Sequence, residues 1–375
     1  MDFEFTDDQN SLRDAMRRWV DKGFGFERRH ALAKAGGASR AVYAELCELG
    51  LAGLVVPDSH GGLGQGPVDA MVVCEELGRG LVHAPYAFAC LMAPALLAAA
   101  SPEMQAQVLP GVASGERLTI PALQERSARY KLSQVSTRAQ AAGGDWVLTG
   151  TKCAVPAGDE ADEFIVPARI SGGDQDSDGI GLFLVSAAAT RRSAYATQDG
   201  GRAADVTMQA SPASLISLKG YAAMETALDV GVAAHCAEGV GLMDRLVDIT
   251  VEYMNTRKQF GNTLASFQAL RHRMADVKMQ LELGRSMSYF ASLKLQEPPA
   301  QRRRAVAQAR VQLGHSMRFV GQQCIQLHGG IACTDEYVAS HYFKRLTMLE
   351  VTLGDTLHHL GQVSDCMQDT AGVFA

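Results

Sequence analysis

The chain has 375 residues, of which 47% are hydrophobic, 20% charged and only 6% aromatic, and its formal net charge at pH 7 is −6. This composition excludes a disordered or collagen-like protein, because enough apolar side chains are present to offset the entropy of folding. The longest cationic run, Arg302–Arg304, is too short to form a nucleic-acid-binding face. The length predicts two or three packed units.

The first 115 residues are predicted to form a helical domain. Three apolar stripes recur at the three- and four-residue spacing of a helix face; they are Phe5–Trp19, Val42–Leu49 and Val68–Leu77. Gly50 follows the second stripe in a position typical of a helix C-cap.

Residues 116–217 have a different pattern, in which short apolar runs alternate with Gly, Asp and Ser. Such runs predict strands, and the candidates are Leu118–Ala122, Trp146–Thr149, Phe164–Ala168 and Gly179–Val185. We therefore expect a central β domain.

From residue 218 to 375 the helical spacing returns. Three long stripes run over Leu228–Tyr253, Phe267–Leu281 and Leu313–Leu327, and Pro298-Pro299 must break the chain between the last two. With a fourth helix after Thr347, these predict an antiparallel four-helix bundle. The fold class is α+β, with domains at 1–115, 116–217 and 218–375.

No membrane span, disulfide framework or metal site is expected. The apolar stretch Ala84–Ala100 contains two prolines and is too short to cross a bilayer, and Met1–Asn10 has no signal-peptide pattern. The eight cysteines never have C-x-x-C spacing and are predicted to be reduced thiols in the cytoplasm. The acidic residues 174–179 resemble a calcium loop but lack its final glutamate, and the adjacent His358 and His359 point apart on a helix.

Two segments carry stronger chemical signals. The first is Arg257-Lys258-Gln259-Phe260-Gly261, followed by Phe267-Gln268. It places an arginine where a long helix ends, and a guanidinium there can clamp a pyrophosphate. The second is Gln326-Leu327-His328-Gly329-Gly330, in which a helix ends at two glycines that allow a ligand to approach the backbone.

These segments resemble the signatures of the acyl-CoA dehydrogenase family. So do Val56-Pro57 with Gly61–Gly64, Glu75–Gly78, and Gly150-Thr151-Lys152 after Trp146-Val147-Leu148. Together they cover nearly the whole chain in family order. Within the family, His341–Leu349 with Gly354-Asp355 and His358–Leu360 is most similar to the small subunit of the heteromeric pimeloyl-CoA dehydrogenase type.

The resemblance implies an acyl-CoA dehydrogenase-like fold with a β-barrel-like central domain, and FAD as the cofactor. Arg257 matches the residue that pairs with the FAD pyrophosphate. The other positions that match cofactor contacts are Gln259, Phe260, Gln268, Gln326, Gly329 and Gly330. Because these contacts cross subunits in the family, a homo- or hetero-oligomer is implied.

The implied reaction is α,β-desaturation of an acyl-CoA thioester, with electrons passed on to an electron-transfer flavoprotein. A carboxylate removes the α-proton, and a raised pKa makes it a better base. In the family this carboxylate is usually a glutamate that immediately precedes a Gly-Thr pair in the C-terminal segment, and the comparable stretch here is Leu349–Thr356. Asp355 and Glu350 are the candidates in this chain, and Glu225 is a weaker third option.

Several positions depart from the family pattern. Ala154-Val155-Pro156 stands where the family often has Trp-Ile-Thr beside the flavin ring, and Leu123-Gln124-Glu125 replaces a Thr-Glu-Pro stretch. Val232 stands about where an arginine often helps to place the acyl-CoA.

The FAD-clamp motifs are intact, whereas the substrate and base positions depart from the family pattern, and three hypotheses follow from this contrast. The leading one is a subunit of a heteromeric acyl-CoA dehydrogenase, with a dicarboxylyl thioester such as pimeloyl-CoA as a candidate substrate. A self-sufficient homotetrameric enzyme and a non-catalytic structural subunit that binds FAD or CoA are the alternatives.

Overall fold

The computed structural model describes residues 4–37, 39–143 and 145–368, and these form two compact units interleaved in sequence. The bundle unit contains the chain up to His30, Pro67–Val82 and the chain from Val232 onward. The barrel unit contains Ala31–Gly66 and His83–Gly231. Packing thus assigns parts of the N-terminal helical region to both units, whereas the sequence analysis divides the chain into three consecutive segments.

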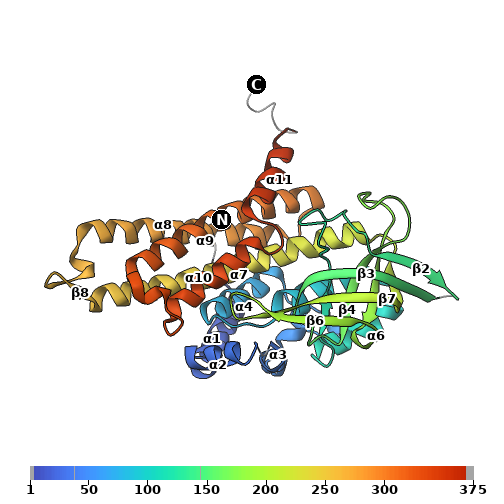
Figure 1. Cartoon of the computed structure of the whole chain (residues 1–375), viewed down its shortest axis with the longest axis horizontal. Helices are drawn as coiled ribbons and strands as arrows, with labels where there is room; N and C mark the ends of the chain where they lie inside the picture. The colour runs from blue at the N-terminus through green and yellow to red at the C-terminus, as the bar shows by residue number, and fades with distance from the viewer. Residues whose placement is uncertain (1–3, 38, 144, 369–375) are drawn as a thin grey trace. The chain divides into compact units, whose positions relative to one another are not determined.

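The barrel unit is built on a sheet whose strand pairing closes on itself, and several of its strands are labelled in Figure 1. β4 pairs with β2 in parallel, and β2–β3, β3–β7, β7–β5 and β5–β4 pair antiparallel, so the path returns to its start. Closure leaves few unpaired strand edges. The strands are β1 (Thr119–Pro121), β2 (Arg138–Ala142), β3 (Asp145–Pro156), β4 (Glu163–Arg169), β5 (Ile180–Ser186), β6 (Arg191–Ala196) and β7 (Arg202–Ser217).

Short helices accompany the barrel in the same unit. They are α3 (Ser39–Glu48), η1 (Leu51–Gly53), η2 (Asp58–His60), the π-helix η3 (Ala87–Met92), α5 (Ala93–Leu97), α6 (Pro102–Ala113) and η4 (Ala187–Ala189). Gly50 follows α3 with φ of +76°, as expected for a helix C-cap.

The bundle unit is helical. Its helices are α1 (Asp7–Gly23), α4 (Pro67–Arg79), α8 (Gln268–Lys294), α9 (Pro299–His328), α10 (Val338–Val351) and α11 (Thr356–Gln368), with η5 (Leu264–Ser266), η6 (Gly329–Cys333) and the hairpin of β8 (Lys258–Gln259) and β9 (Asn262–Thr263). Two helices, α2 (Phe26–Lys34) and the 37-residue α7 (Gly220–Thr256), contribute residues to both units. α8 and α9 lie side by side, separated in the chain by the predicted break at Pro298-Pro299 (Figure 1).

Two glycines bring α4 and α7 into backbone contact. A Cβ atom added to Gly78 would lie 2.1 Å from the carbonyl oxygen of Glu238, and one added to Gly241 would lie 1.8 Å from that of Glu75. Since no side chain fits in these gaps, the glycines set the distance at which the helices cross. Beside the crossing, Glu76 accepts hydrogen bonds from Arg17 (2.7 Å) and Arg79 (2.6 Å).

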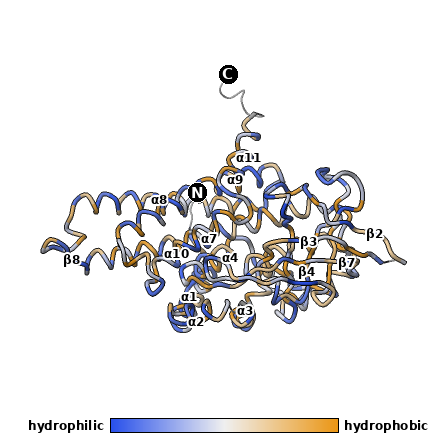
Figure 2. Tube along the Cα trace, viewed as in Figure 1, coloured by the Kyte–Doolittle hydropathy of each residue, from blue (hydrophilic) through white to orange (hydrophobic). Residues whose placement is uncertain are grey.

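Four predicted strands correspond to β1, β3, β4 and β5, whereas β2, β6 and β7 were not predicted. The predicted fourth bundle helix begins earlier, at Val338, and a separate helix, α11, follows it. Hydrophilic residues interrupt the hydrophobic ones along α8 and α9 (Figure 2). Within the part of the chain that the structure describes, no helix is long and apolar enough to cross a membrane.

Candidate cofactor and substrate sites

The predicted FAD-binding segments meet at one cavity of the bundle unit. The cavity, here called the clamp cavity, has a volume of about 380 Å³. Its lining residues are Tyr253, Arg257, Gln259, Leu264, Leu270, Arg273, Gln326, Leu327, His328 and Gly329. Two segments that are far apart in the sequence therefore lie around one space.

The end of α7 and the turn after it position Arg257 and Gln259. The Arg257 N–H donates to the Tyr253 carbonyl oxygen at 2.8 Å, which continues the helical pattern by one residue. The β8–β9 hairpin then reverses the chain, with positive φ at Phe260 (+53°) and Gly261 (+80°). Phe260 is 89% exposed and does not line the cavity, so its predicted contact would have to be made beyond this chain's own cavity.

The end of α9 forms the opposite wall. Gly329 has φ of +66°, and a Cβ atom at Gly329 or Gly330 would meet nothing within 4 Å. This leaves open space above the backbone where a ligand can approach. His328 is buried, its Nδ1 donates to the Cys324 carbonyl oxygen at 2.8 Å, and burial lowers its pKa. Its ring centroid lies 4.7 Å from that of Tyr253.

The donor set of the clamp cavity fits the adenosine diphosphate half of FAD. Arg257 and Arg273 supply two guanidinium groups for a pyrophosphate, and Gln259 and Gln326 supply amide groups. Sequence reasoning missed Arg273, although it lies three residues after the lining residue Leu270 and so faces the same way on α8. Gln268 is exposed at the first position of α8 and is not among the lining residues.

The two leading candidates for the catalytic carboxylate are bonded near the N-terminus of α11: Asp355 directly precedes this helix, and Glu350 belongs to the end of α10. Glu350 Oε1 accepts from the backbone N–H and hydroxyl of Thr356, at 3.1 and 2.6 Å. Asp355 Oδ1 accepts from the His358 N–H at 2.8 Å, as an N-cap residue does. The residue directly before Gly354 is the apolar Leu353. These contacts favour a capping role, and the base role of either residue stays a prediction.

The barrel unit shows how the departures from the family pattern are accommodated. The Ala154 N–H lies 3.1 Å from the Tyr195 hydroxyl oxygen and 3.2 Å from Asp205 Oδ1, and the Tyr195 hydroxyl donates to Asp205 at 3.0 Å. Pro156 has no N–H to offer. In this segment the N–H of Ala154 is thus bonded within the protein, and residue 156 has no N–H to donate.

A buried ion pair lies next to this segment. Lys152 is fully buried, and its Nζ donates to Glu125 Oε1 at 2.7 Å. The Thr137 hydroxyl and N–H also donate to Oε1, at 2.7 and 3.0 Å, and the Ser136 N–H donates to Oε2 at 2.7 Å. Although burial acts to raise it, the charge and hydrogen bond of Lys152 with the bonds from Thr137 lower the pKa of Glu125 to about 2.

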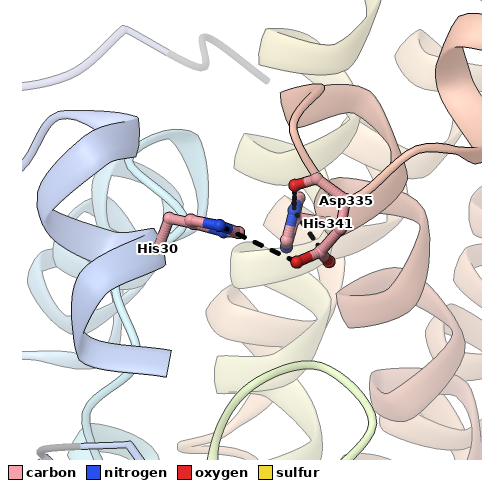
Figure 3. Close-up of side chains that lie close together, drawn as sticks. All are labelled: His30, Asp335 and His341. Atoms are coloured by element: carbon pink, nitrogen blue, oxygen red, sulfur yellow. Dashed lines mark hydrogen bonds and ion pairs between the residues drawn. The ribbon is translucent and has the colours of Figure 1, made fainter. Parts of the chain in front are cut away.

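One cluster of side chains in the bundle unit has the residue types of a metal site (Figure 3). It consists of His30, Asp335 and His341. One potential ligand atom of each lies within 4.8 Å of the others. However, Arg29 donates to His341 Nδ1, so His341 Nε2 must carry the proton that it donates to the Asp335 carbonyl oxygen at 2.8 Å. That ring has no lone pair left for a cation. Lys344 Nζ, 3.2 Å from Asp335 Oδ1, adds a positive charge. We interpret the group as a network of hydrogen bonds and ion pairs.

Comparison with known proteins identifies the class of protein that this fold and cavity define. Residues 6–116 match the family description "Acyl-CoA dehydrogenase, N-terminal domain", and residues 219–367 match "Acyl-CoA dehydrogenase, C-terminal domain". The acyl-CoA dehydrogenase IpdE2 of Mycobacterium tuberculosis is 32% identical over 345 residues, which cover 90% of this chain and 91% of the relative.

Two solved structures are also similar. One is the ChsE4-ChsE5 complex from Mycobacterium tuberculosis, with 26% identity, a TM-score of 0.88, and coverage of 98% of this chain and 99% of that chain. The other is a variant of the Tcur3481-Tcur3483 steroid ACAD, with 27% identity, a TM-score of 0.87, and coverage of 97% of this chain and 99% of that chain.

The chain belongs to the acyl-CoA dehydrogenase family. It is an FAD-dependent oxidoreductase of that family, with the expected helical, barrel and bundle regions, and the predictions of fold class, enzyme class and cofactor are confirmed.

Proposed function

We propose that this chain is one subunit of a heteromeric acyl-CoA dehydrogenase and that its clamp cavity holds the adenosine end of an FAD shared with a homologous partner subunit. The observation that carries the proposal is a contrast within the chain. The clamp cavity is open and has two guanidinium groups, whereas the segment around Ala154 and Pro156 is bonded to its own barrel.

In this proposal the residues of the chain bind and orient the cofactor. Arg257 and Arg273 neutralise the pyrophosphate, Gln259 and Gln326 bond polar atoms of the adenosine half, and Gly329 lets it approach the backbone. Bound FAD supplies the hydride acceptor for desaturation of the acyl-CoA. The α-proton is removed by a carboxylate of the partner subunit, because Glu350 and Asp355 cap α11 and Leu353 precedes Gly354.

The proposed substrate and electron acceptor rest on the family resemblance. The substrate is a dicarboxylyl-CoA of the pimeloyl-CoA type, as the similarity of His341–Leu349 and the residues after it suggests. The electron acceptor is an electron-transfer flavoprotein, and the eight cysteines, which form no disulfide with one another, suit the reducing cytoplasm. Two similar structures are named for pairs of proteins, which supports a heteromeric assembly.

Co-expression with the product of the neighbouring gene tests the assembly. We expect the pair to copurify with one FAD per two chains and to reduce ferrocenium with acyl-CoA, whereas this chain alone stays inactive. Full activity of the chain alone, with one FAD per chain, would contradict the proposal and support the self-sufficient enzyme.

A matched pair of variants tests the clamp. Arg257→Met removes a lining guanidinium, and we expect the FAD dissociation constant of the assembly to rise about tenfold or more, since a charge-assisted bond is lost. Arg271→Met removes an exposed arginine outside the cavity and serves as the control. Equal FAD affinities for the two variants would refute the role of Arg257.

A further inference from the structure

The bundle unit contains a second cavity, larger than the clamp cavity. It has a volume of about 500 Å³ and lies where the ends of α1 and α4 meet α2, the second half of α7 and the start of α10. Among the described residues, Tyr253 alone lines both cavities, so the two spaces are neighbours with separate linings.

Three arginines line this second cavity. They are Arg29, Arg79 and Arg245, and the lining carboxylates are Asp21 and Glu252. The lining therefore carries one net positive charge, in a chain whose formal net charge is −6. Guanidinium groups in a concave, partly desolvated space are suited to paired hydrogen bonds with carboxylate or phosphate.

Packing fixes the positions of two of these arginines. Arg79 Nε donates to Glu76 at 2.6 Å and another of its nitrogens donates to Asp21 at 2.9 Å. The side chain of Arg29 is buried, and one of its nitrogens donates to His341 Nδ1. Groups held in this way lose little conformational entropy when an anion binds.

Aromatic and aliphatic side chains form the rest of the wall. The rings are Phe24, Phe26, Tyr253, Tyr337 and Tyr342, with Val20, Leu81, Ile249 and Val338 between them. The ring centroids of Tyr253 and Tyr337 lie 6.3 Å apart, with 60° between the planes, and the Tyr342 hydroxyl donates to the Arg79 carbonyl oxygen at 2.6 Å. Such walls favour a flat, apolar body.

We propose that this cavity binds a small organic anion whose charged group meets the arginines and whose flat ring packs against the aromatic wall. The cavity is of a size typical of small-molecule sites. An aromatic carboxylate and a nucleoside monophosphate share this chemistry, and they differ in whether the anion is a carboxylate or a phosphate.

Calorimetric titration of the FAD-saturated protein with 2-naphthoate and with AMP tests the proposal. Saturation with FAD fills the clamp cavity first, and the readout does not depend on catalytic activity. We expect one of the two probes to bind and the neutral 2-naphthalenemethanol to bind at least tenfold more weakly. Tighter binding of naphthoate identifies the carboxylate class, and tighter binding of AMP identifies the phosphate class.

Variants locate the bound probe. Arg245→Met is expected to weaken binding about tenfold or more, because a charge-assisted hydrogen bond to the anion is lost, and Arg271→Met is expected to leave it unchanged. Val338→Trp, which fills the cavity and keeps every charge, should abolish binding. The proposal is overturned if neither probe binds at millimolar concentration, or if Val338→Trp binds the probe as the parent protein does.

Discussion

Replacing Lys152 with methionine should destabilise the barrel unit strongly, because it leaves the Glu125 carboxylate buried without its cation. Lys152 is fully buried, and the side chain of Glu125 is 5% exposed. Water therefore cannot replace the lost ion pair. Methionine has a similar length, so the change removes the charge with little loss of packing volume.

The expected loss is about 3 kcal/mol. Removing one partner of a buried ion pair typically costs about 3–5 kcal/mol, and three donors from Ser136 and Thr137 remain on the carboxylate, which places the loss near the lower limit. The lowered pKa of Glu125, about 2 against its ordinary 4.5, agrees in direction, because it shows that the folded protein favours the charged carboxylate.

The pH dependence provides a second test. In the parent protein the folded pKa of Glu125 lies below the unfolded value, so its contribution is complete above about pH 4.5 and is lost as the pH falls towards 2. Without Lys152, burial raises the pKa of Glu125, and protonation relieves the strain of the unpaired charge. The destabilisation by Lys152→Met should therefore be smaller at pH 5 than at pH 7.

Urea unfolding followed by Trp146 fluorescence measures the effect in the barrel. Trp146 lies in β3, and a Trp19→Phe background leaves it as the sole tryptophan. Lys131→Met, at an exposed lysine of the same unit, is the control and should change the free energy of unfolding by less than about 0.5 kcal/mol. A loss below about 1 kcal/mol for Lys152→Met, or one that is the same at both pH values, would refute the reasoning.

Three further changes have expected outcomes. Gly241→Ala should cost about 2 kcal/mol or more in chemical denaturation, since its Cβ would lie 1.8 Å from the Glu75 carbonyl oxygen, whereas Gly361→Ala, where a Cβ meets nothing within 4 Å, should not destabilise. Burial lowers the pKa of His359 to about 3, so its contribution to stability is complete above about pH 6.5 and falls as the pH drops towards 3. In His359→Gln the free energy of unfolding, measured by urea denaturation, should therefore change less between about pH 6.5 and 4.5 than in the parent protein. Glu350→Ala should lower stability by about 1 kcal/mol through the lost cap and change turnover of the assembly less than about threefold, whereas a loss of about 10²-fold would identify Glu350 as the base.

The sequence was sufficient for the long helices and for the strands with continuous apolar runs, whereas the short helices α2, α5 and α6 had no predicted stripe. α9 begins at the predicted proline pair, and β4 and β5 coincide with runs of Val, Ile, Leu and Phe. β7 was missed because its second half is rich in Ala and Ser and contains Pro212, and these residues are poor strand formers. Its position depends on pairing with β3, β5 and β6 rather than on its own strand propensity.

The candidate sites were predictable where a motif is local. Arg257 and Gln326 belong to motifs whose members lie within a few residues, and the fold brings them to one cavity. The second cavity has no such signal, because Arg29, Arg79 and Arg245 come from three helices far apart in the chain. Spacing along a sequence cannot reveal a charge cluster that only tertiary packing assembles.

The interleaving of the two units has a consequence for synthesis on the ribosome. The bundle unit receives its first two segments by Val82 and its next only from Val232 onward, about 150 positions later. At about 5–20 residues per second, about 8–30 s pass between Val82 and Val232, so the apolar faces of α1 and α4 lack the second half of α7 for that time and lack α8 and α10 for longer. Nascent chains are then exposed to aggregation or chaperone capture for that time, and a fragment that ends after the barrel would lack the helices that complete its first unit.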